Sequence, residues 1–398
     1  MSSDKPRPLA GVSVLDLARF IAGPLCAQVL GDLGADVIKV ERPSGEDSRE
    51  ALPLIKGESL YTLAFNRNKR GVTLNLRKPE AKPILARLIE WADIVVENFR
   101  PGVMDAMGCG YETLRQSKPA IIMASVSGFG QDGPLAQRAL FDPIAQGLSG
   151  LMYMTGHEGD PPLMAGSFIA DYSAALYAVI GTLSALRLRD ATGQGQHIDV
   201  ALVDSAFSLL ISNVPLYDLL GQTLPRSGNR DRFGAPANSF RCRDGYVYLD
   251  GSSDSLFPRL AEAIGKPELA TDPRYAKNEA RSERVEELER YILEWLGNMT
   301  REQCVAALDR AGVPCGPILT VGEAMESEQL RYRNQICEVD HPVLGRVRIS
   351  GVPVTGSGMT CEVRLPAPTI GQHNEEVYAQ LCGLTRTEIA SLREKGVL

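Results

Sequence analysis

Short, uninterrupted apolar runs alternate with segments of helical spacing through the N-terminal third of the chain. Val12–Leu17 and Asp36–Val40 are strand-like, and Leu25–Leu33 between them has the character of a helix. Ile94–Val96 and Ala120–Val126 are continuous apolar runs, which are typical of strands buried on both faces of a parallel sheet. This alternation predicts an α/β fold whose ligands bind beyond the carboxyl ends of the strands.

The rest of the sequence adds further expected elements. Gly71–Leu76 is strand-like, Pro79–Trp91 has helical spacing, and Phe240–Leu249 has the turn signal of a hairpin. The polar, turn-rich segment Gly228–Pro236 indicates a change of domain. Further helices are expected at Tyr172–Arg189, Val203–Leu220, Leu256–Ile264, Ser282–Leu296, Arg301–Ala311 (with a capping start at Thr300 and Gln303) and Thr387–Lys395.

The composition of the 398 residues, 44% hydrophobic and 23% charged, is that of a globular protein large enough for two domains. The net charge of −7 provides no basic excess, so neither nucleic acid nor an anionic membrane is expected as a partner. The N-terminal segment lacks the apolar core of a secretory signal, and no uninterrupted run of about 18 apolar residues predicts a membrane helix. We therefore expect a cytoplasmic protein.

The eight cysteines and four histidines are scattered, with no CxxC pair. They are typical of reduced thiols rather than of a disulfide framework or a zinc site. No GxGxxG opens a helix after the first strand, and no GxxxxGK[ST] is present. The sequence therefore predicts neither a metal nor a permanently bound cofactor.

Asp171 is the only acidic residue in the apolar, small-residue run Met164–Leu186. Burying an unpaired charge is costly, so this carboxylate must be capped, paired or used in chemistry. One interpretation is a helix N-cap before Tyr172–Arg189, because aspartate is a favoured cap. The other is a reactive carboxylate, and the two are compatible.

Seven short strings follow one another along nearly the whole chain, in an order and spacing that are specific as a set. They are Ala22–Gly23–Pro24, Gly34–Pro43, Asn66–Leu76, Ala92–Gly102, Ser125–Gly130 with Gly133–Pro134, Asp171, and Thr192–Leu202. Together they resemble the family III CoA-transferases, the CaiB-BaiF superfamily. This superfamily includes formyl-CoA transferase, carnitine CoA-transferase and the α-methylacyl-CoA racemases.

The resemblance implies a Rossmann-like large α/β domain built from both chain ends, a smaller α+β domain, and an interlocked homodimer. On this basis residues 1–225 would form the N-terminal part of the large, CoA-binding domain. Residues 226–335 would form the small domain, and residues 336–398 would return to the large one.

The resemblance also implies roles for individual residues. The family nucleophile is an aspartate that opens a helix after a small-residue stretch, and Asp171 matches it. Asp142 matches an acidic residue near the nucleophile, and Gly251 lies in the region of a loop over the site, so both are expected to contact substrate. The positions that match CoA-binding residues are Ile21, Ala22, Arg42, Leu74, Asn75, Arg77, Asn98, Phe99, Arg100, Arg138 and Phe141.

Four positions depart from the family patterns. Formyl-CoA transferase has glutamine at Ile21, arginine at Ala106, and a long glycine loop where this chain reads Gly251–Asp254 with one glycine. These differences argue against the oxalate–formate pair. The racemases have a histidine at Phe141, which argues against removal of an α-proton.

Several of these residues also have structural interpretations. Lys69–Arg70 could form a solvated turn, and Asp142 could be a structural acid of a helix or turn. Arg42 could have no role beyond an ion pair with Glu41. In the functional interpretation the chain moves CoA from an acyl-CoA, with succinyl-CoA as the expected donor, to a small carboxylic acid through a thioester on Asp171. The alternatives are an acyl-CoA racemase of the same superfamily and a non-catalytic CoA-binding protein.

Overall fold

The computed structural model describes residues 5–398, which divide into two compact units. The first contains the chain up to Met152 together with Met164–Pro215 and Glu328–Leu398, and the second contains Tyr153–Leu163 and Leu216–Ser327. The predicted domain boundaries, after residues 225 and 335, stay a prediction.

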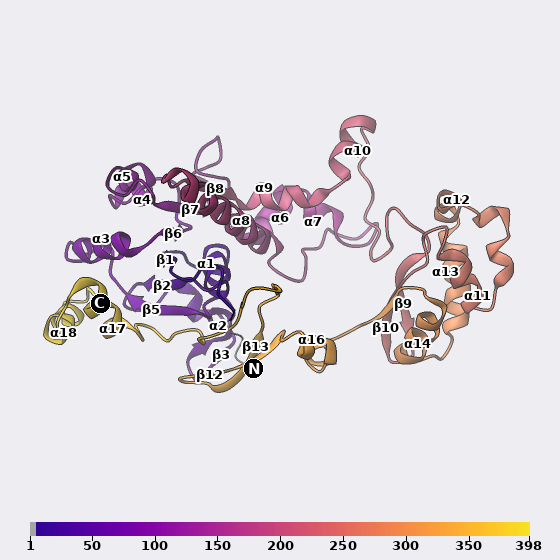
Figure 1. Ribbon diagram of the computed structural model, residues 1–398. Helices are drawn as coiled ribbons and strands as arrows, with labels where there is room; N and C mark the ends of the chain where they lie inside the picture. The colour runs from indigo at the N-terminus through magenta and orange to yellow at the C-terminus, as the bar shows by residue number, and fades with distance from the viewer. Residues whose placement is uncertain (1–4) are drawn as a thin grey trace. The chain divides into compact units, whose positions relative to one another are not determined.

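The first unit is built on a six-stranded parallel sheet in the order β5-β2-β1-β6-β7-β8 (Figure 1). The predicted α/β class with a central parallel sheet is therefore confirmed. Its strands are β1 (Ser13–Asp16), β2 (Asp36–Glu41), β5 (Lys69–Thr73), β6 (Ile94–Glu97), β7 (Ile122–Ser127) and β8 (His197–Ala201).

Each face of the sheet carries its own hydrophobic core, because successive side chains of a strand point to opposite faces. On one face, α1 (Ala22–Asp32) and α8 (Ile169–Thr192) cover a core that includes Val14 and Val96. On the other, α3 (Ala81–Trp91) and α17 (Asn374–Cys382) cover a core that includes Leu15 and Val95. This double burial explains why these strands are apolar without interruption.

The direction of strand succession reverses at the centre of the sheet. From β1 the chain proceeds to β2 and β5 on one side, whereas β6, β7 and β8 follow on the other. The loops after β1 and β6 therefore diverge at the carboxyl edge and leave a crevice, which is the usual ligand position in open parallel sheets.

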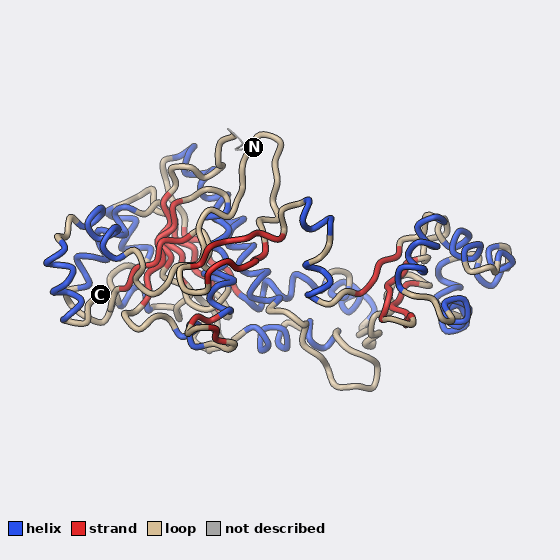
Figure 2. Tube along the Cα trace, turned by 90° about the horizontal axis from the view of Figure 1, so that it is seen from below, coloured by secondary structure: helices blue, strands red, loops and turns tan. Residues whose placement is uncertain are grey.

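The second unit has a three-stranded antiparallel sheet, β11-β10-β9, with most of its helices to one side of the strands (Figure 2). The predicted hairpin is confirmed as β9 (Ala237–Cys242) and β10 (Gly245–Asp250). The predicted capping start is also confirmed, because Thr300 and Gln303 form a reciprocal capping box on α14. The other elements of this unit include α11 (Phe257–Ala263), α12 (Asn278–Glu283), α13 (Val285–Leu296), α14 (Arg301–Ala311), β11 (Cys315–Ile318) and α15 (Val321–Met325).

Two predicted helices are interrupted, and the edge strand β8 of the parallel sheet was not predicted. Val203–Leu220 splits into α9 (Leu202–Phe207) and α10 (Asn213–Leu220), because Ile211 adopts a left-handed φ of 45° between them. Ser282–Leu296 is divided between α12 and α13 at Arg284. Strand β8 lies at the sheet edge, where its exposed His197 breaks the apolar pattern that marked the other strands.

The structure also contains a set of mostly short helices, strands and turns. They are β3 (Leu54–Ile55), β4 (Glu58–Ser59), α2 (Leu60–Phe65), α4 (Val103–Ala106), α5 (Tyr111–Ser117), α6 (Asp142–Leu148), α7 (Leu151–Met154), α16 (Glu328–Tyr332), β12 (Ile336–His341), β13 (Gly345–Ser350), α18 (Arg386–Glu394) and four short 3-10 turns at Asp47–Glu50, Ser208–Leu210, Pro267–Ala270 and Pro273–Tyr275. Among residues 5–398, one helix, α8, is long and apolar enough to cross a membrane by length and composition alone. Core helices often pass the same test, and α8 buries Ala174, Ala175 and Ala178 in the first unit.

Candidate functional site

Two cavities lie along the carboxyl edge of the parallel sheet. The first, the Asp171 pocket, has a volume of about 430 Å³ and is lined by Asp171 and by loops that follow β1, β6, β7 and β8. The second, the Arg42 pocket, has a volume of about 940 Å³ and is lined by Arg42 and by loops that follow β1, β2, β5 and β6. Arg19, Phe99 and Arg100 line both, so the cavities adjoin at the crevice where strand succession reverses.

The structure gathers most of the predicted site residues in these cavities. Ile21 is 1% exposed at the N-cap position of α1 and lines neither, so only its backbone could meet a ligand. Gly251 lies in the second unit, packed against Leu260. The Asp171 pocket contains Ala22, Asn98, Phe99, Arg100, Arg138, Phe141, Asp142 and Asp171, and the Arg42 pocket contains Arg42, Leu74, Asn75, Arg77, Phe99 and Arg100.

Asp171 lies in the first turn of α8, three residues after the N-cap position, which Phe168 occupies. Its carboxylate makes no capping bond to the helix. Instead, Oδ1 of Asp142 accepts hydrogen bonds from the backbone N–H groups of Ala170, at 2.7 Å, and Asp171, at 3.1 Å. The interpretation of Asp171 as the N-cap is therefore wrong, because a residue from another helix caps α8 and leaves the Asp171 side chain free.

Asp142 is fully buried at the start of α6, where Pro143 follows it at a position that favours helix initiation. Its Oδ2 accepts a hydrogen bond from Nε2 of Gln146 at 2.5 Å, and Oε1 of Gln146 accepts one from the amide of Ala165 at 2.9 Å. Asp142 is thus a structural acid of α6, as one interpretation of the sequence had it, and it also lines the Asp171 pocket. A direct contact with substrate stays a prediction.

The surroundings of Asp171 oppose its ionisation. Burial, followed by the negative charge of Asp142, raises the pKa of Asp171 to about 7. Burial also raises the pKa of the Tyr61 hydroxyl above its usual range, with the Asp171 carboxylate as the next cause. Near neutral pH Asp171 is therefore partly ionised, and its carboxylate is more basic than an ordinary one, which suits a group that attacks a carbonyl carbon.

The cationic groups of the cavities differ in their partners. Within residues 5–398, the side chains of Arg100 and Arg138 form no hydrogen bond or ion pair, although both line the Asp171 pocket. Arg42 lies 2.7 Å from Asp47, with about half of its side chain exposed. The interpretation of Arg42 as a partner of Glu41 alone is wrong, because Glu41 is paired with Arg49.

Lys69 belongs to the fold and to neither cavity. It is fully buried in β5, and its Nζ lies 2.7 Å from Oδ2 of Asp16. The adjacent Arg70 lies 2.6 Å from Asp36. The solvated-turn interpretation of Lys69–Arg70 is therefore wrong.

The residues of the Asp171 pocket that sequence reasoning missed include Arg19, Phe20 and Tyr61. Arg19 and Phe20 stand between the end of β1 and the start of α1, a position that could have identified them as ligand-facing. Tyr61 has no such signal, because it reaches the pocket from α2, outside the parallel sheet.

Within residues 5–398, no three histidine, cysteine, aspartate or glutamate side chains lie close enough together to hold a metal ion. The eight cysteines are all free.

Comparison with known proteins adds three findings. Residues 9–374 match the family model described as CoA-transferase family III. The chain is 40% identical to succinyl-CoA–D-citramalate CoA-transferase of Chloroflexus aurantiacus, over 100% of both chains, and 36% identical to formyl-CoA:oxalate CoA-transferase of Streptomyces avermitilis, over 98% and 100%. A solved CAIB/BAIF family protein from Brucella suis superposes with a TM-score of 0.85 at 36% identity, covering 95% of this chain and 100% of that one.

Proposed function

The chain belongs to CoA-transferase family III and is an enzyme of that class, and from this premise we propose that it moves CoA from succinyl-CoA to a small carboxylic acid through a covalent thioester on Asp171. The observation that carries the proposal is the position of Asp171. It is a carboxylate that caps nothing, in a pocket adjoining a second cavity large enough for a nucleotide-bearing substrate.

The proposed reaction has four steps. The ionised carboxylate of Asp171 attacks the thioester carbonyl of the donor, and CoA leaves as a thiolate while a mixed anhydride forms. The thiolate attacks the aspartyl carbonyl, releasing the donor acid and forming an aspartyl-CoA thioester. The acceptor carboxylate displaces the thiolate to give a second anhydride, and the thiolate then captures the acceptor acyl group and restores Asp171. Covalent catalysis of this kind divides one difficult exchange into easier steps.

Two arginines of the Asp171 pocket support a donor whose acyl group carries a second carboxylate. Arg138 and Arg100 present guanidinium groups without ionic partners in the Asp171 pocket, and arginine is suited to bidentate contact with a carboxylate. The C. aurantiacus relative is named for succinyl-CoA and a hydroxylated dicarboxylic acid, which agrees with such a pocket. We propose a small dicarboxylic acid as acceptor and CoA itself as a substrate rather than a resident cofactor.

We also propose that the enzyme acts as an interlocked homodimer in the cytoplasm. The support for a dimer is the face of α8 that bears Tyr172, Leu176 and Ile180, which are 40%, 49% and 58% exposed at helical spacing. Eight free cysteines agree with a reducing compartment.

A donor–acceptor screen tests the transfer itself. The protein is incubated with succinyl-, acetyl- or formyl-CoA and a set of free acids, and new CoA thioesters are identified by mass spectrometry. We expect succinyl-CoA with small dicarboxylic acids to give the fastest exchange. Formation of no new thioester from any donor would rule out the proposal, and incorporation of deuterium from D₂O at the α-carbon of an acyl-CoA would indicate the racemase alternative.

The nucleophile is tested separately with Asp171→Ala. Wild-type protein mixed with donor is expected to carry an adduct on Asp171 that hydroxylamine or borohydride removes, and the variant should carry none and transfer no CoA. Glu112→Ala, at a solvent-exposed ion pair with Arg115, is the matched carboxylate control and should behave as the wild type.

A further inference from the structure

Side chains bind the backbone groups of Ala18, Arg19 and Phe20 in the loop between β1 and α1. The amide of Ala18 donates to Oδ1 of Asp16 at 2.9 Å, and its carbonyl accepts from Nζ of Lys39 at 2.9 Å. The amide and carbonyl of Arg19 are both bound by the side-chain amide of Asn98, at 2.8 and 2.7 Å. This loop supplies Arg19 and Phe20 to the wall of the Asp171 pocket.

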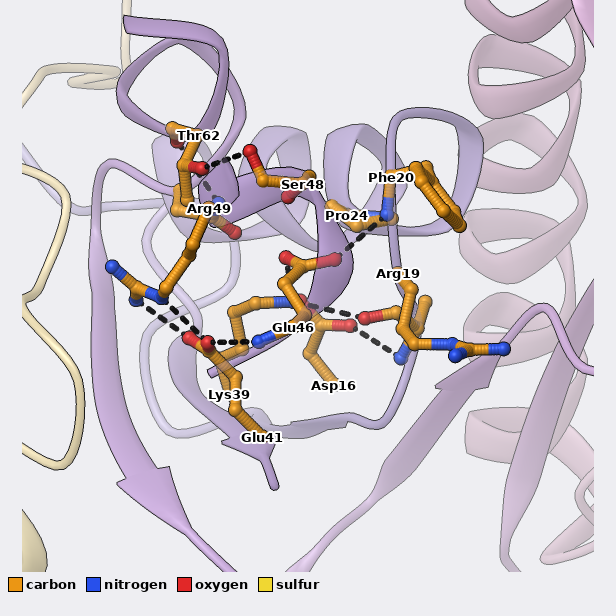
Figure 3. A network of polar contacts seen from close by, with 12 residues as sticks. Asp16, Arg19, Phe20, Pro24, Lys39, Glu41, Glu46, Ser48, Arg49 and Thr62 are labelled. Carbon is orange, nitrogen blue, oxygen red and sulfur yellow. Dashed lines mark hydrogen bonds and ion pairs between the residues drawn. The ribbon is translucent and has the colours of Figure 1, made fainter. Parts of the chain in front are cut away.

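Phe20 is fixed by Glu46. The amide of Phe20 donates to Oε2 of Glu46 at 2.8 Å, while Oε1 of Glu46 lies 3.0 Å from Nζ of Lys39 (Figure 3). The amide of Glu46 in turn donates to Oε2 of Glu41, which is bound bidentately by Arg49 at 2.6 Å. Glu46, Lys39 and Glu41 are all buried, so a connected network of buried charges ends on one backbone amide of the pocket wall.

That amide belongs to a strained residue. Phe20 has a φ of 64°, in the left-handed region that bulky side chains rarely adopt. Such a conformation is energetically costly and persists only where the surroundings impose it. Burying Lys39 and Glu46 is itself costly, and replacing buried ion pairs by apolar residues is often neutral or stabilising. The network is therefore better explained by the backbone conformation that it imposes on Phe20 than by a contribution to the stability of the fold.

The conformation of Phe20 determines where α1 begins. Ile21 and Ala22 follow at once, and Ala22 is the first helical residue and lines the Asp171 pocket. Its amide belongs to the first turn, where N–H groups have no partner within the helix, and no acceptor for it is found within residues 5–398. A donor of this kind in the cavity that Asp171 also lines is suited to binding the oxygen of a tetrahedral intermediate.

We propose that Glu46 is a positioning residue for the transfer reaction: bound to Lys39, it holds Phe20 in the left-handed conformation and thereby keeps the amide of Ala22 at the wall of the Asp171 pocket, where it stabilises the oxyanion formed on attack by Asp171. This inference rests on the proposed function. Glu46 also lines the Arg42 pocket, but it does not line the Asp171 pocket, on which it acts through the backbone of Phe20.

The kinetic test compares Glu46→Ala with Glu46→Gln. Displacing an oxyanion donor slows catalysis about 100-fold, so Glu46→Ala should lower kcat by about that factor with less than a threefold change in KM for the acyl-CoA. Glu46→Gln keeps an oxygen acceptor within reach of Phe20 and should recover at least tenfold of the loss. The matched control is Asp32→Asn, which breaks a buried ion pair with Arg67 outside both cavities and should lower Tm while leaving kcat unchanged.

A second measurement does not depend on activity. Hydrogen–deuterium exchange of the peptide that spans Leu17–Leu25 should accelerate at least tenfold in Glu46→Ala, accelerate less in Glu46→Gln, and remain at the wild-type rate in Asp32→Asn. Unchanged exchange in both Glu46 variants, or accelerated exchange with an unchanged kcat, would overturn the inference. If the wild type transfers no CoA, the proposed function fails, whereas the exchange data still decide whether Glu46 holds the loop.

Discussion

The carboxylate of Asp142 accepts a hydrogen bond from the backbone amide of Asp171 at 3.1 Å, and its negative charge adds to burial in raising the pKa of the Asp171 side chain. One residue thus fixes the position of a neighbouring aspartate while opposing its ionisation. Three of the predictions below depend on this relationship between a structural carboxylate and a reactive one.

Substitution of Asp142 should separate its two effects. Asp142→Ala removes the acceptor for two amides of α8 and leaves Nε2 of Gln146 with only the longer bond to the carbonyl of Ser167, at 3.4 Å, so it should reduce the free energy of unfolding by about 2–4 kcal/mol. Asp142→Asn retains an oxygen acceptor and should cost less than half as much. Urea unfolding of both variants checks this order, and equal destabilisation would contradict the capping role.

The pH dependence of catalysis should show the raised pKa of Asp171. Because the nucleophile must be ionised, kcat/KM should rise about tenfold per pH unit from pH 5 and level off near pH 7. Asp142→Asn removes the like charge and should move this rise to lower pH. Initial rates between pH 5 and 9 provide the measurement.

That profile needs a control, because burial also raises the pKa of Glu97 to about 7. Glu97 lies at the end of β6 and accepts a hydrogen bond from the amide of Phe99 at 2.8 Å. Glu97→Gln should leave the rise of kcat/KM in place if Asp171 is responsible. Its disappearance in Glu97→Gln would assign the titration to Glu97 instead.

Asp171→Asn should stabilise the fold in a pH-dependent way. The folded-state pKa of Asp171 lies above its ordinary value, so between pH 4 and 7 the folded protein holds a proton that the unfolded chain has lost. Stability of the wild type therefore falls as pH rises through this window, and the variant lacks that fall. The variant should match the wild type near pH 3.5 and exceed it by about 2 kcal/mol at pH 8. Parallel urea titrations at these pH values test the difference, and a gap of equal size at both would refute it.

Arg138 should determine the preference for a second carboxylate. It lines the Asp171 pocket but not the Arg42 pocket, so Arg138→Ala should raise KM for succinyl-CoA by about 10- to 100-fold and leave KM for acetyl-CoA within threefold. Arg115→Ala, at a surface ion pair with Glu112, is the control. A parallel loss with both donors would indicate that Arg138 binds the CoA part of the substrate.

The fold could be predicted from sequence where burial on both faces leaves no polar position. Ile94–Val96 and Ala120–Val126 identified β6 and β7 for this reason, and Gly34 marked the end of α1 within two residues. Edge strand β8 could not be identified in the same way, because its exposed face carries His197 and Asp199. The break between α9 and α10 at Ile211 could not be predicted either, because the residue with positive φ is not a glycine.

The candidate site was less predictable, because its chemistry depends on pairings across long sequence separations. The local sequence around Lys69 is compatible with a solvated turn, and only the structure shows its partner Asp16, 53 residues earlier in the chain. Asp142 caps a helix that begins 27 residues later, and no local motif marks such a cap. The assignment of Asp171 came from family resemblance together with its isolation in an apolar run, and its test remains experimental.

The two cavities are built on different strands and share only the loops that follow β1 and β6. The loops after β2 and β5 line the cavity proposed for the nucleotide part of CoA, whereas those after β7 and β8 line the cavity of the proposed nucleophile, Asp171. Sequence changes in the loops after β7 and β8 can therefore alter which acid receives CoA, while the binding of the nucleotide part of CoA stays the same. Divergence among enzymes with this architecture should accordingly concentrate on one half of the sheet.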